Sequence, residues 1–288
     1  MSHTDTMFES VGRSIELVKT SWNILMDEKK LMVFPVLSGI VILMVILTFV
    51  LPLLFAGNFL DLTSIGPVLY YGLLFVFYLV SYFVVIFFNT ALITCVNAWL
   101  NGRDMTAAEG LSNAVRHIGS ILVWALISAT VGLILRIIHD KAGFIGQIAT
   151  AIVGGVWSLV TFFVVPILIL EDKGVVDSIK ESVSLIKKTW GESIVGSGSI
   201  MLIFVAIGIV GFLVVFATLL VGNMVVFGIA AVLFIFLVVV LAIVASAMQG
   251  IFVTALYMYA RTGTVPAAFD KNLIQNAFIP KQAGSGNI

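Results

Sequence analysis

Four acidic residues stand close together where a long apolar segment gives way to a charged one: Glu171, Asp172, Asp177 and Glu181. Two carboxyl groups held at different pKa values can serve as general acid and general base. Acidic residues are also common in the first turn of a helix, because they meet the positive end of the helix dipole. We favour this second interpretation, in which the four carboxylates are solvated and have no catalytic role.

The other reactive side chains form no recognisable site. His3, His117 and His139 are far apart in the sequence and lack the short spacing of metal ligands. Cys95 is the only cysteine, so the chain holds no disulfide or redox pair of its own. The sequence also lacks a phosphate-binding loop, a dinucleotide fingerprint and a nucleophile elbow. We therefore predict a protein that is not an enzyme, with no catalytic residue, no cofactor and no metal site.

Three polar residues inside apolar segments are candidate intramembrane polar positions: Asn89, Thr161 and Gln249. They occupy equivalent positions when the long apolar segments are aligned by their ends. If those segments are arranged with pseudo-symmetry, the three side chains meet at one depth in the membrane. Hydrogen bonds between such side chains are worth about 0.6–2 kcal/mol. They either join helices or line a binding site, and we favour the structural role.

The elements that carry these residues are apolar segments of membrane-spanning length. Hydrophobic residues make up 61% of the 288 residues and charged residues 10%, against about 45–50% and about 25% in soluble domains. Several apolar runs exceed the ~18 residues that indicate a transmembrane helix. We predict an all-α polytopic membrane protein with six transmembrane helices, at about 31–56, 67–100, 118–138, 144–170, 193–220 and 224–259.

A charged segment at residues 9–22, ESVGRSIELVKTSW, recurs at residues 177–190 as DSIKESVSLIKKTW. We call these the first and second start segments. Their apolar residues fall at steps of three and four, which predicts an amphipathic helix. We expect each to lie in the membrane interface with its apolar face toward lipid, the alternative being a surface helix packed on protein. The identical pairs are Ser10/Ser178, Ser14/Ser182, Leu17/Leu185, Lys19/Lys187 and Trp22/Trp190.

The start segments divide the chain into three hairpin repeats, at about 8–100, 104–170 and 176–260. Each repeat consists of an interfacial helix, a span, a short outer loop and a second span. The middle start segment, at 110–121, matches the others poorly, so whether it begins a true third repeat stays open. Asp104 or Thr106 is expected to cap its helix. We predict a single membrane domain over 1–261 and a polar, partly disordered tail over 262–288.

The distribution of charge predicts the orientation of the spans. With six spans, all but two of the 15 Lys and Arg residues fall on the side of the termini, the exceptions being Arg136 and Lys141. The positive-inside rule then places both termini, and the three amphipathic helices, on the cytoplasmic side of the plasma membrane. Aromatic residues near the helix ends are expected to anchor them in the interface: Trp22, Trp99, Trp190 and Tyr259.

The segment from Trp22 through the charged stretch DEKKLMVFP to Pro35, with Ser38-Gly39 beyond, resembles the opening of an uncharacterised prokaryotic family of multi-pass membrane proteins. The resemblance extends over most of the chain, through Trp190 and into the last span. More distantly, the chain resembles the membrane domain attached to some glycerophosphodiester phosphodiesterases. It has no phosphodiesterase domain, so that activity is not implied. The family of unknown function implies no site residues.

Two functions agree with these patterns. The first is a non-enzymatic membrane factor or scaffold that works through its interfacial helices, with the lipid bilayer and possible protein partners at the cytoplasmic face. The alternative is a transporter or channel for a neutral or amphiphilic solute, lined by the candidate polar positions. No Asp, Glu, Lys or Arg lies in the middle of a predicted span, which argues against a proton-coupled antiporter. The net charge of zero gives no reason to expect a nucleic acid partner.

Overall fold

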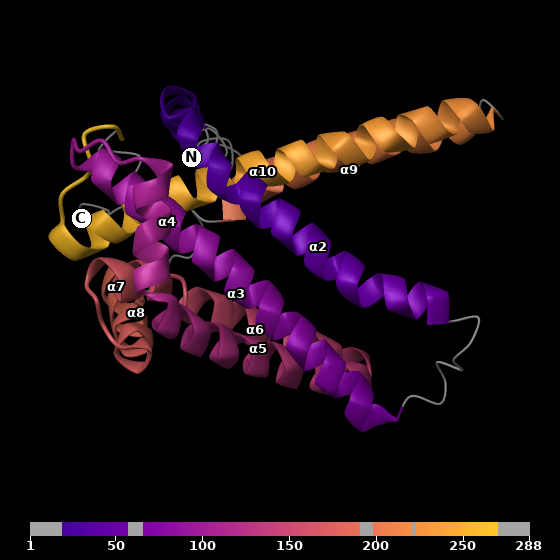
Figure 1. The fold of residues 1–288 in the computed structure, drawn as a ribbon, viewed down its shortest axis with the longest axis horizontal. Helices are drawn as coiled ribbons and strands as arrows, with labels where there is room; N and C mark the ends of the chain where they lie inside the picture. Colours follow the sequence, from indigo (N-terminus) through magenta and orange to yellow (C-terminus); the bar gives the residue numbers. More distant parts are fainter. Residues whose placement is uncertain (1–18, 57–65, 191–197, 221–222, 270–288) are drawn as a thin grey trace, which may run out of the picture. The chain divides into compact units, whose positions relative to one another are not determined.

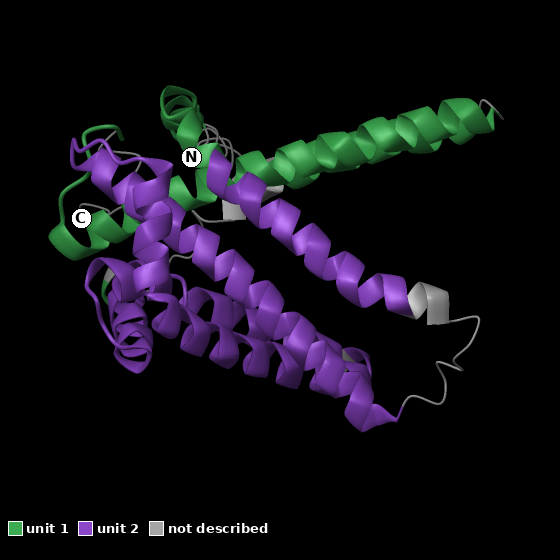
Figure 2. Ribbon diagram, viewed as in Figure 1, with its two compact units in different colours: residues 1–32, 188–288 green, residues 33–187 purple. Residues whose placement is uncertain are grey.

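The structure is a computed structural model that describes residues 19–56, 66–190, 198–220 and 223–269 (Figure 1). The described residues form helices and turns without a strand, which confirms the all-α prediction. The chain divides into two compact units, one of residues Met1–Met32 with Lys188–Ile288 and the other of Val33–Lys187 (Figure 2). Residues 9–18 of the first start segment and 270–288 of the predicted tail lie outside the described residues.

Helix α3 is the central element of the unit Val33–Lys187. It runs over 34 residues, begins with a proline at its first position, and packs against α2, α4, α5 and α7. Proline suits that position because its missing N–H would be unpaired there in any helix. The elements of this unit are, in chain order, α2 (Val33–Ala56), α3 (Pro67–Leu100), α4 (Ala107–Arg116), α5 (Ile118–Lys141), α6 (Phe144–Val160), α7 (Val164–Leu170) and α8 (Val175–Trp190), of which residues 188–190 fall in the other unit.

The core of this unit lies at one end of its long helices. The second half of α3 is buried at most positions from Val84 to Ala98, and the first half of α5 is buried at Ile121 and Trp124. Helix α7 is buried along most of its length. The remaining halves of α3 and α5 expose large apolar side chains, such as Val68 and Ile134. An exposed apolar surface is unfavourable in water and favourable in hydrocarbon, so these halves of α3 and α5 suit a lipid environment.

The second half of α3 packs closely against α4. A Cβ atom built on Gly110 would lie 2.5 Å from Cys95 Sγ, 3.0 Å from Ala91 O and 3.2 Å from Phe34 Cζ. Helix α4 begins with a capping box, in which the N–H of Glu109 donates to Thr106 Oγ1 at 3.2 Å. The N–H of Thr106 donates in return to Glu109 Oε2 at 2.7 Å. This confirms Thr106 as the cap of the predicted helix.

The fourth predicted span contains a break. Helix α6 ends at Val160, α7 begins at Val164, and residues 161–163 form a turn. Pro166 explains the break, because a proline has no N–H and its ring clashes with the carbonyl four residues earlier, that of Phe162. The N–H of Phe162 bonds instead to Leu159 O, three residues back, at 3.0 Å.

The other unit contains η1 (Lys29–Met32), α9 (Gly198–Leu219) and α10 (Met224–Thr262). Helices α9 and α10 pack side by side (Figure 1), and a Cβ atom at Gly211 of α9 would lie 2.8 Å from Phe234 of α10. Asn223 caps α10 through Oδ1, which accepts the N–H groups of Val225 and Val226. At its other end α10 stops at Gly263, which takes the left-handed conformation with φ of 71°.

Five helical segments of the described chain are long and apolar enough to cross a membrane: Lys29–Pro52, Pro67–Leu100, Ile118–Lys141, Gly146–Leu170 and Met224–Thr262. A shorter apolar segment, Phe204–Leu219, lies within α9. The structure therefore supports a membrane protein with several spanning helices, in agreement with the apolar runs in the sequence.

Candidate functional site

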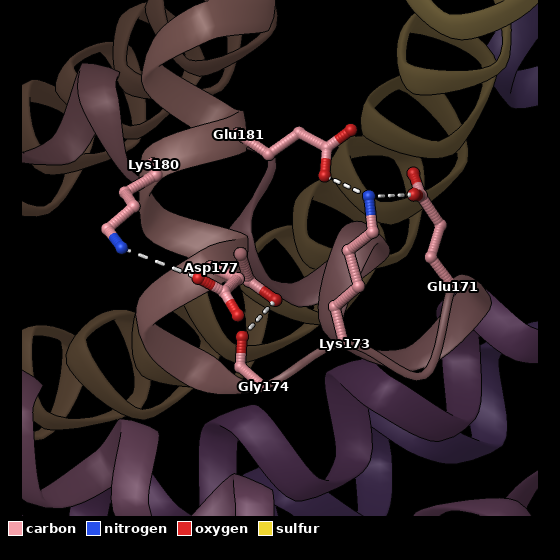
Figure 3. Close-up of polar contacts among 7 residues, drawn as sticks. Glu171, Lys173, Gly174, Asp177, Lys180 and Glu181 are labelled. Atoms are coloured by element: carbon pink, nitrogen blue, oxygen red, sulfur yellow. Dashed lines mark hydrogen bonds and ion pairs between the residues drawn. The ribbon is translucent and has the colours of Figure 1, made fainter.

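The charged side chains of the unit Val33–Lys187 lie mainly on α4, on the loop 171–174 and on α8. We call these three segments the polar end. Lys173 lies between two carboxylates, with Nζ 2.7 Å from Glu171 Oε2 and in direct contact with Glu181 Oε2 (Figure 3). The hydrogen bond to Glu171, followed by that to Glu181, raises the pKa of Lys173. These two contacts link the loop 171–174 to the second turn of α8.

The four clustered acids of the sequence each lie beside a basic residue. Glu171 and Glu181 share Lys173, Asp177 lies 3.5 Å from Lys180 Nζ, and Asp172 lies 3.3 Å from His117. A general acid and base pair requires two carboxyl groups directed at one reacting centre. Here the two carboxylates that come together, Glu171 and Glu181, are both occupied by Lys173, which suits an electrostatic and structural role.

His117 connects α4 and α5 to the loop 171–174. Its Nδ1 lies 2.8 Å from Asn113 O, and its Nε2 lies 3.3 Å from Asp172 Oδ1. A carbonyl and a carboxylate both accept hydrogen bonds, so the doubly protonated ring is the form in which both nitrogens donate. Asp172 itself has a φ of 50°, in the left-handed region. Asp tolerates this conformation better than most residues do.

Ser182 of α8 completes the hydrogen bonding of the break in the fourth span. The N–H of Phe163 donates to Ser182 Oγ at 3.1 Å, and both residues are fully buried. Removing the acceptor of a buried N–H costs about 1–3 kcal/mol. Ser178, one turn earlier, is also fully buried and donates to Gly174 O at 2.9 Å.

Protein covers the serine face of α8. Ser178, Ser182 and Leu185 are all identical between the two start segments, and all three are buried. Val176, directly before the second start segment, is 58% exposed. This side of α8 therefore follows the alternative interpretation, a surface helix packed on protein. The identities between the two start segments thus include the positions where α8 makes its buried contacts.

The three candidate intramembrane positions differ in their surroundings. Asn89 in α3 is half-buried, and Thr161 lies at the break after α6. The hydroxyl of Thr161 donates to Trp157 O in its own helix at 2.7 Å. Gln249 is exposed in α10, which belongs to the other unit. Their convergence at one depth stays a prediction.

The four predicted anchors all lie on described helices. Trp22 is 42% exposed, within the helical segment 19–27, and Trp99 and Tyr259 are half-buried near the ends of α3 and α10. Trp190 is the last residue of α8, and its side chain is outside the described side chains. The partial exposure of the other three near helix ends suits the interface, where an aromatic ring combines an apolar body with a polar tip.

Sequence reasoning missed the contacts that join distant segments of the polar end. It identified the serines as identical residues of the start segments without assigning them to the buried face. Their signal was their spacing of four, because Ser178, Ser182 and the leucine three residues later share one helix face. It also treated His117 as isolated, since nothing in the local sequence indicates that Asp172 lies beside it.

The apolar helices and the polar helices at their ends define a multi-pass α-helical membrane protein. The chain belongs to a family of unknown function, DUF6159, whose profile matches residues 68–267. The opening segment from Trp22 to Pro35, which suggested an uncharacterised membrane family, lies before the matched residues. No curated protein and no solved structure matches the chain. The resemblance to phosphodiesterase membrane domains therefore rests on the sequence pattern alone.

Proposed function

We propose that this protein is a non-enzymatic membrane scaffold that binds its partners through the polar end. The observation that carries the proposal is how the threonines of the apolar helices use their hydroxyl groups. With the exception of Thr90, each described threonine of these helices donates its hydroxyl proton to a backbone carbonyl three or four residues earlier in the chain. That proton is therefore not available for a hydrogen bond to a transported solute. The residues are Thr48, Thr94, Thr130, Thr150, Thr161, Thr218, Thr254 and Thr262.

Helix α8 supplies the surface for such contacts. While its serine face is buried, its uncovered side carries four exposed polar residues: Lys180, Ser184, Lys187 and Lys188. Steps of three and four residues place them on one side of the helix. Lys187 and Lys188 form no ion pair with any described residue. Two unpaired ammonium groups on a helix held by its other face suit a partner with acidic groups.

We further propose the six-span, three-hairpin arrangement for the membrane domain. Helix α9 supports it, because its 22 residues reach about 33 Å, enough for the ~30 Å hydrocarbon layer. Helices α3 and α10 support the repeat, because each is exposed in its first half and buried near its end. Within the buried parts, Thr94 donates to Thr90 O and Thr254 to Gly250 O, at positions equivalent in our alignment.

With six spans, the distribution of Lys and Arg places both termini and the polar end in the cytoplasm, in the plasma membrane. Reporter fusions after residue 288 and after residue 142 test this orientation. Alkaline phosphatase is active outside the cytoplasm and green fluorescent protein fluoresces inside it. We expect fluorescence from the first site and phosphatase activity from the second. The reverse pattern, or the same pattern at both sites, contradicts the topology.

The scaffold role is tested by site-specific photo-crosslinking in native membranes. A photoreactive amino acid is placed at Lys187 on the polar end, or at Ile207, an exposed apolar residue of α9, as the matched control. We expect discrete protein adducts from position 187 that disappear when Lys180 and Lys188 are both changed to Glu. Adducts that survive this charge reversal, or their absence from position 187, contradict the proposal.

The transporter alternative has one observation in its favour. The hydroxyl of Thr90 is fully buried without a hydrogen-bond partner in the described structure, next to the half-buried Asn89. An unpaired buried hydroxyl can mark a polar path. Liposomes containing the protein are tested for glycerol and urea flux by light scattering after an osmotic step. Flux above that of empty liposomes, lost in Asn89→Leu, would favour transport over the scaffold role.

A further inference from the structure

We propose that the junction of α4 and α5 holds an anionic phospholipid, with its phosphate on Arg116 and its acyl chains along α5. The proposal rests on the scaffold function, because it assigns a lipid to the polar end that presents partners. Arg116 is the last residue of α4, and the candidate span Ile118–Lys141 begins two residues later. The guanidinium group therefore lies where a spanning helix leaves the hydrocarbon, which is the depth of lipid phosphates.

Exposed apolar residues lie on both sides of the junction between α4 and α5. Val115 of α4 is 55% exposed, and Ile118 and Leu122 of α5 are 48% and 51% exposed. The spacing of four residues places Ile118 and Leu122 on one side of α5. An arginine beside such a surface can hold a headgroup while the surface holds the acyl chains. A soluble anion would use the arginine and leave the apolar residues uncovered.

Gly119 leaves room for the lipid directly beside Arg116. A Cβ atom at this position would meet nothing within 4 Å. Gly119 lies three residues after Arg116 in the chain and, within α5, four residues before Val123, which is 47% exposed. The spacing of four places Gly119 and Val123 on one side of α5. The backbone at Gly119 is therefore open beside exposed apolar residues, and we call this opening the strip.

The local charge favours an anionic lipid over a zwitterionic one. Arg116 is exposed and forms no ion pair with any described residue. The nearest acid in the sequence on α4, Glu109, closes the capping box at the other end of that helix. Asp172, which faces the neighbouring His117, is engaged by the imidazole at 3.3 Å. Guanidinium binds phosphate through two parallel hydrogen bonds, which gives Arg an advantage over a point charge.

A lipid is favoured over an acidic protein because the cation and the apolar strip occur together at the end of a span. An acidic protein segment would be recognised by charge alone and would not require the strip to be open. The variant Gly119→Leu separates these two cases. The leucine side chain fills the strip and leaves every charge unchanged. Its Cβ would have no described atom within 4 Å, so it would displace no neighbouring residue.

The test is native mass spectrometry of the full chain in detergent, titrated with dioleoyl-phosphatidylglycerol or with dioleoyl-phosphatidylcholine. We expect the wild-type protein to retain the first phosphatidylglycerol at least about tenfold more tightly than phosphatidylcholine. Arg116→Gln and Gly119→Leu should each weaken the binding of phosphatidylglycerol about tenfold or more. The first variant removes a charged hydrogen bond to the phosphate, and the second blocks the space that the lipid occupies. Arg103→Gln is the matched control, an exposed arginine on the connector before α4, and should change retention by less than about twofold.

Several results would overturn the lipid site. They are equal retention of both lipids by the wild-type protein, unchanged retention in Arg116→Gln or Gly119→Leu, and an equal loss in Arg103→Gln. Thermal unfolding establishes that the variants fold, and Gly119→Ala serves as a second, smaller filling of the strip. Cross-links from position 187 that persist while the lipid results are negative would overturn the lipid site and leave the scaffold role intact. If the lipid results are as expected but position 187 gives no protein cross-links, only the scaffold role is overturned.

Discussion

The backbone N–H of Phe163 donates a hydrogen bond of 3.1 Å to the hydroxyl of Ser182, 19 residues further along the chain. Pro166 frees this N–H by breaking the helix, and the second start segment supplies the acceptor. That segment thus completes the hydrogen bonding of the broken helix that precedes it.

Ser182→Ala should destabilise the protein by about 1–3 kcal/mol, because it removes the hydroxyl that accepts the buried N–H of Phe163. Unfolding of the purified protein in mixed micelles measures the change. Ser184→Ala, an exposed serine on the same helix, is the control and should stay within about 0.5 kcal/mol of wild type. Pro166→Ala lets the helix continue, so Ser182→Ala should cost less in that background. Equal costs in both backgrounds would show that the two residues are not coupled.

Gly110→Ala should destabilise the packing of α4 on α3. The new Cβ would lie 2.5 Å from Cys95 Sγ and 3.0 Å from the backbone oxygen of Ala91. Overpacking of this kind costs about 1–3 kcal/mol, which exceeds the gain of about 1 kcal/mol that alanine brings to a helix. Denaturation in mixed micelles tests this.

Two further variants identify the cause of the Gly110→Ala effect. Gly155→Ala, at a position where a Cβ meets nothing within 4 Å, should show only the gain in helix propensity. Cys95→Ala combined with Gly110→Ala should recover part of the loss, because it removes the sulfur and leaves the Ala91 oxygen in place. No recovery would mean that the sulfur is not the obstacle.

The Lys173 cluster should stabilise the protein at neutral pH and lose its effect at high pH. Hydrogen bonds to Glu171 and then to Glu181 raise the pKa of Lys173 above its ordinary value of 10.5. A raised pKa in the folded state means a contribution that is complete below 10.5 and lost as pH rises through the folded value. The difference in Tm between wild type and Lys173→Met should therefore be constant from about pH 7 to 9 and shrink above 10.5. A difference that stays constant to about pH 11.5 would contradict this assignment.

Asp172 combines a contact with His117 and a left-handed backbone, and two substitutions separate these properties. Asp172→Asn keeps a residue that tolerates positive φ and removes the charge that faces His117. Because the carboxylate is 91% exposed, this change should cost less than about 1 kcal/mol. Asp172→Ala also introduces the left-handed penalty and should cost about 1–2 kcal/mol more. If Asp172→Gly is less stable than Asp172→Ala in thermal unfolding, backbone strain is not the cause.

The extent of some helices followed from local patterns. The apolar runs predicted the residues of α3 and the start of α5, and Thr106 was one of two expected caps for α4. The break in the fourth span had a local signal in Pro166, because a proline acts on the carbonyl four residues before it. Its consequence, an N–H that needs an acceptor, could not be assigned to Ser182 from the sequence.

The sequence by itself determined that this chain is all-helical, that its helices suit a membrane, and where the charged segments between them lie. These properties depend on hydropathy and on periodicities of three to four residues, which are local. Only the tertiary structure decided that Lys173 joins Glu171 to Glu181, that His117 faces Asp172, and that the serines of α8 are buried. Each of these contacts depends on how helices fold back on one another, and an α-helix with two polar sides gives no local indication of which side the protein will cover.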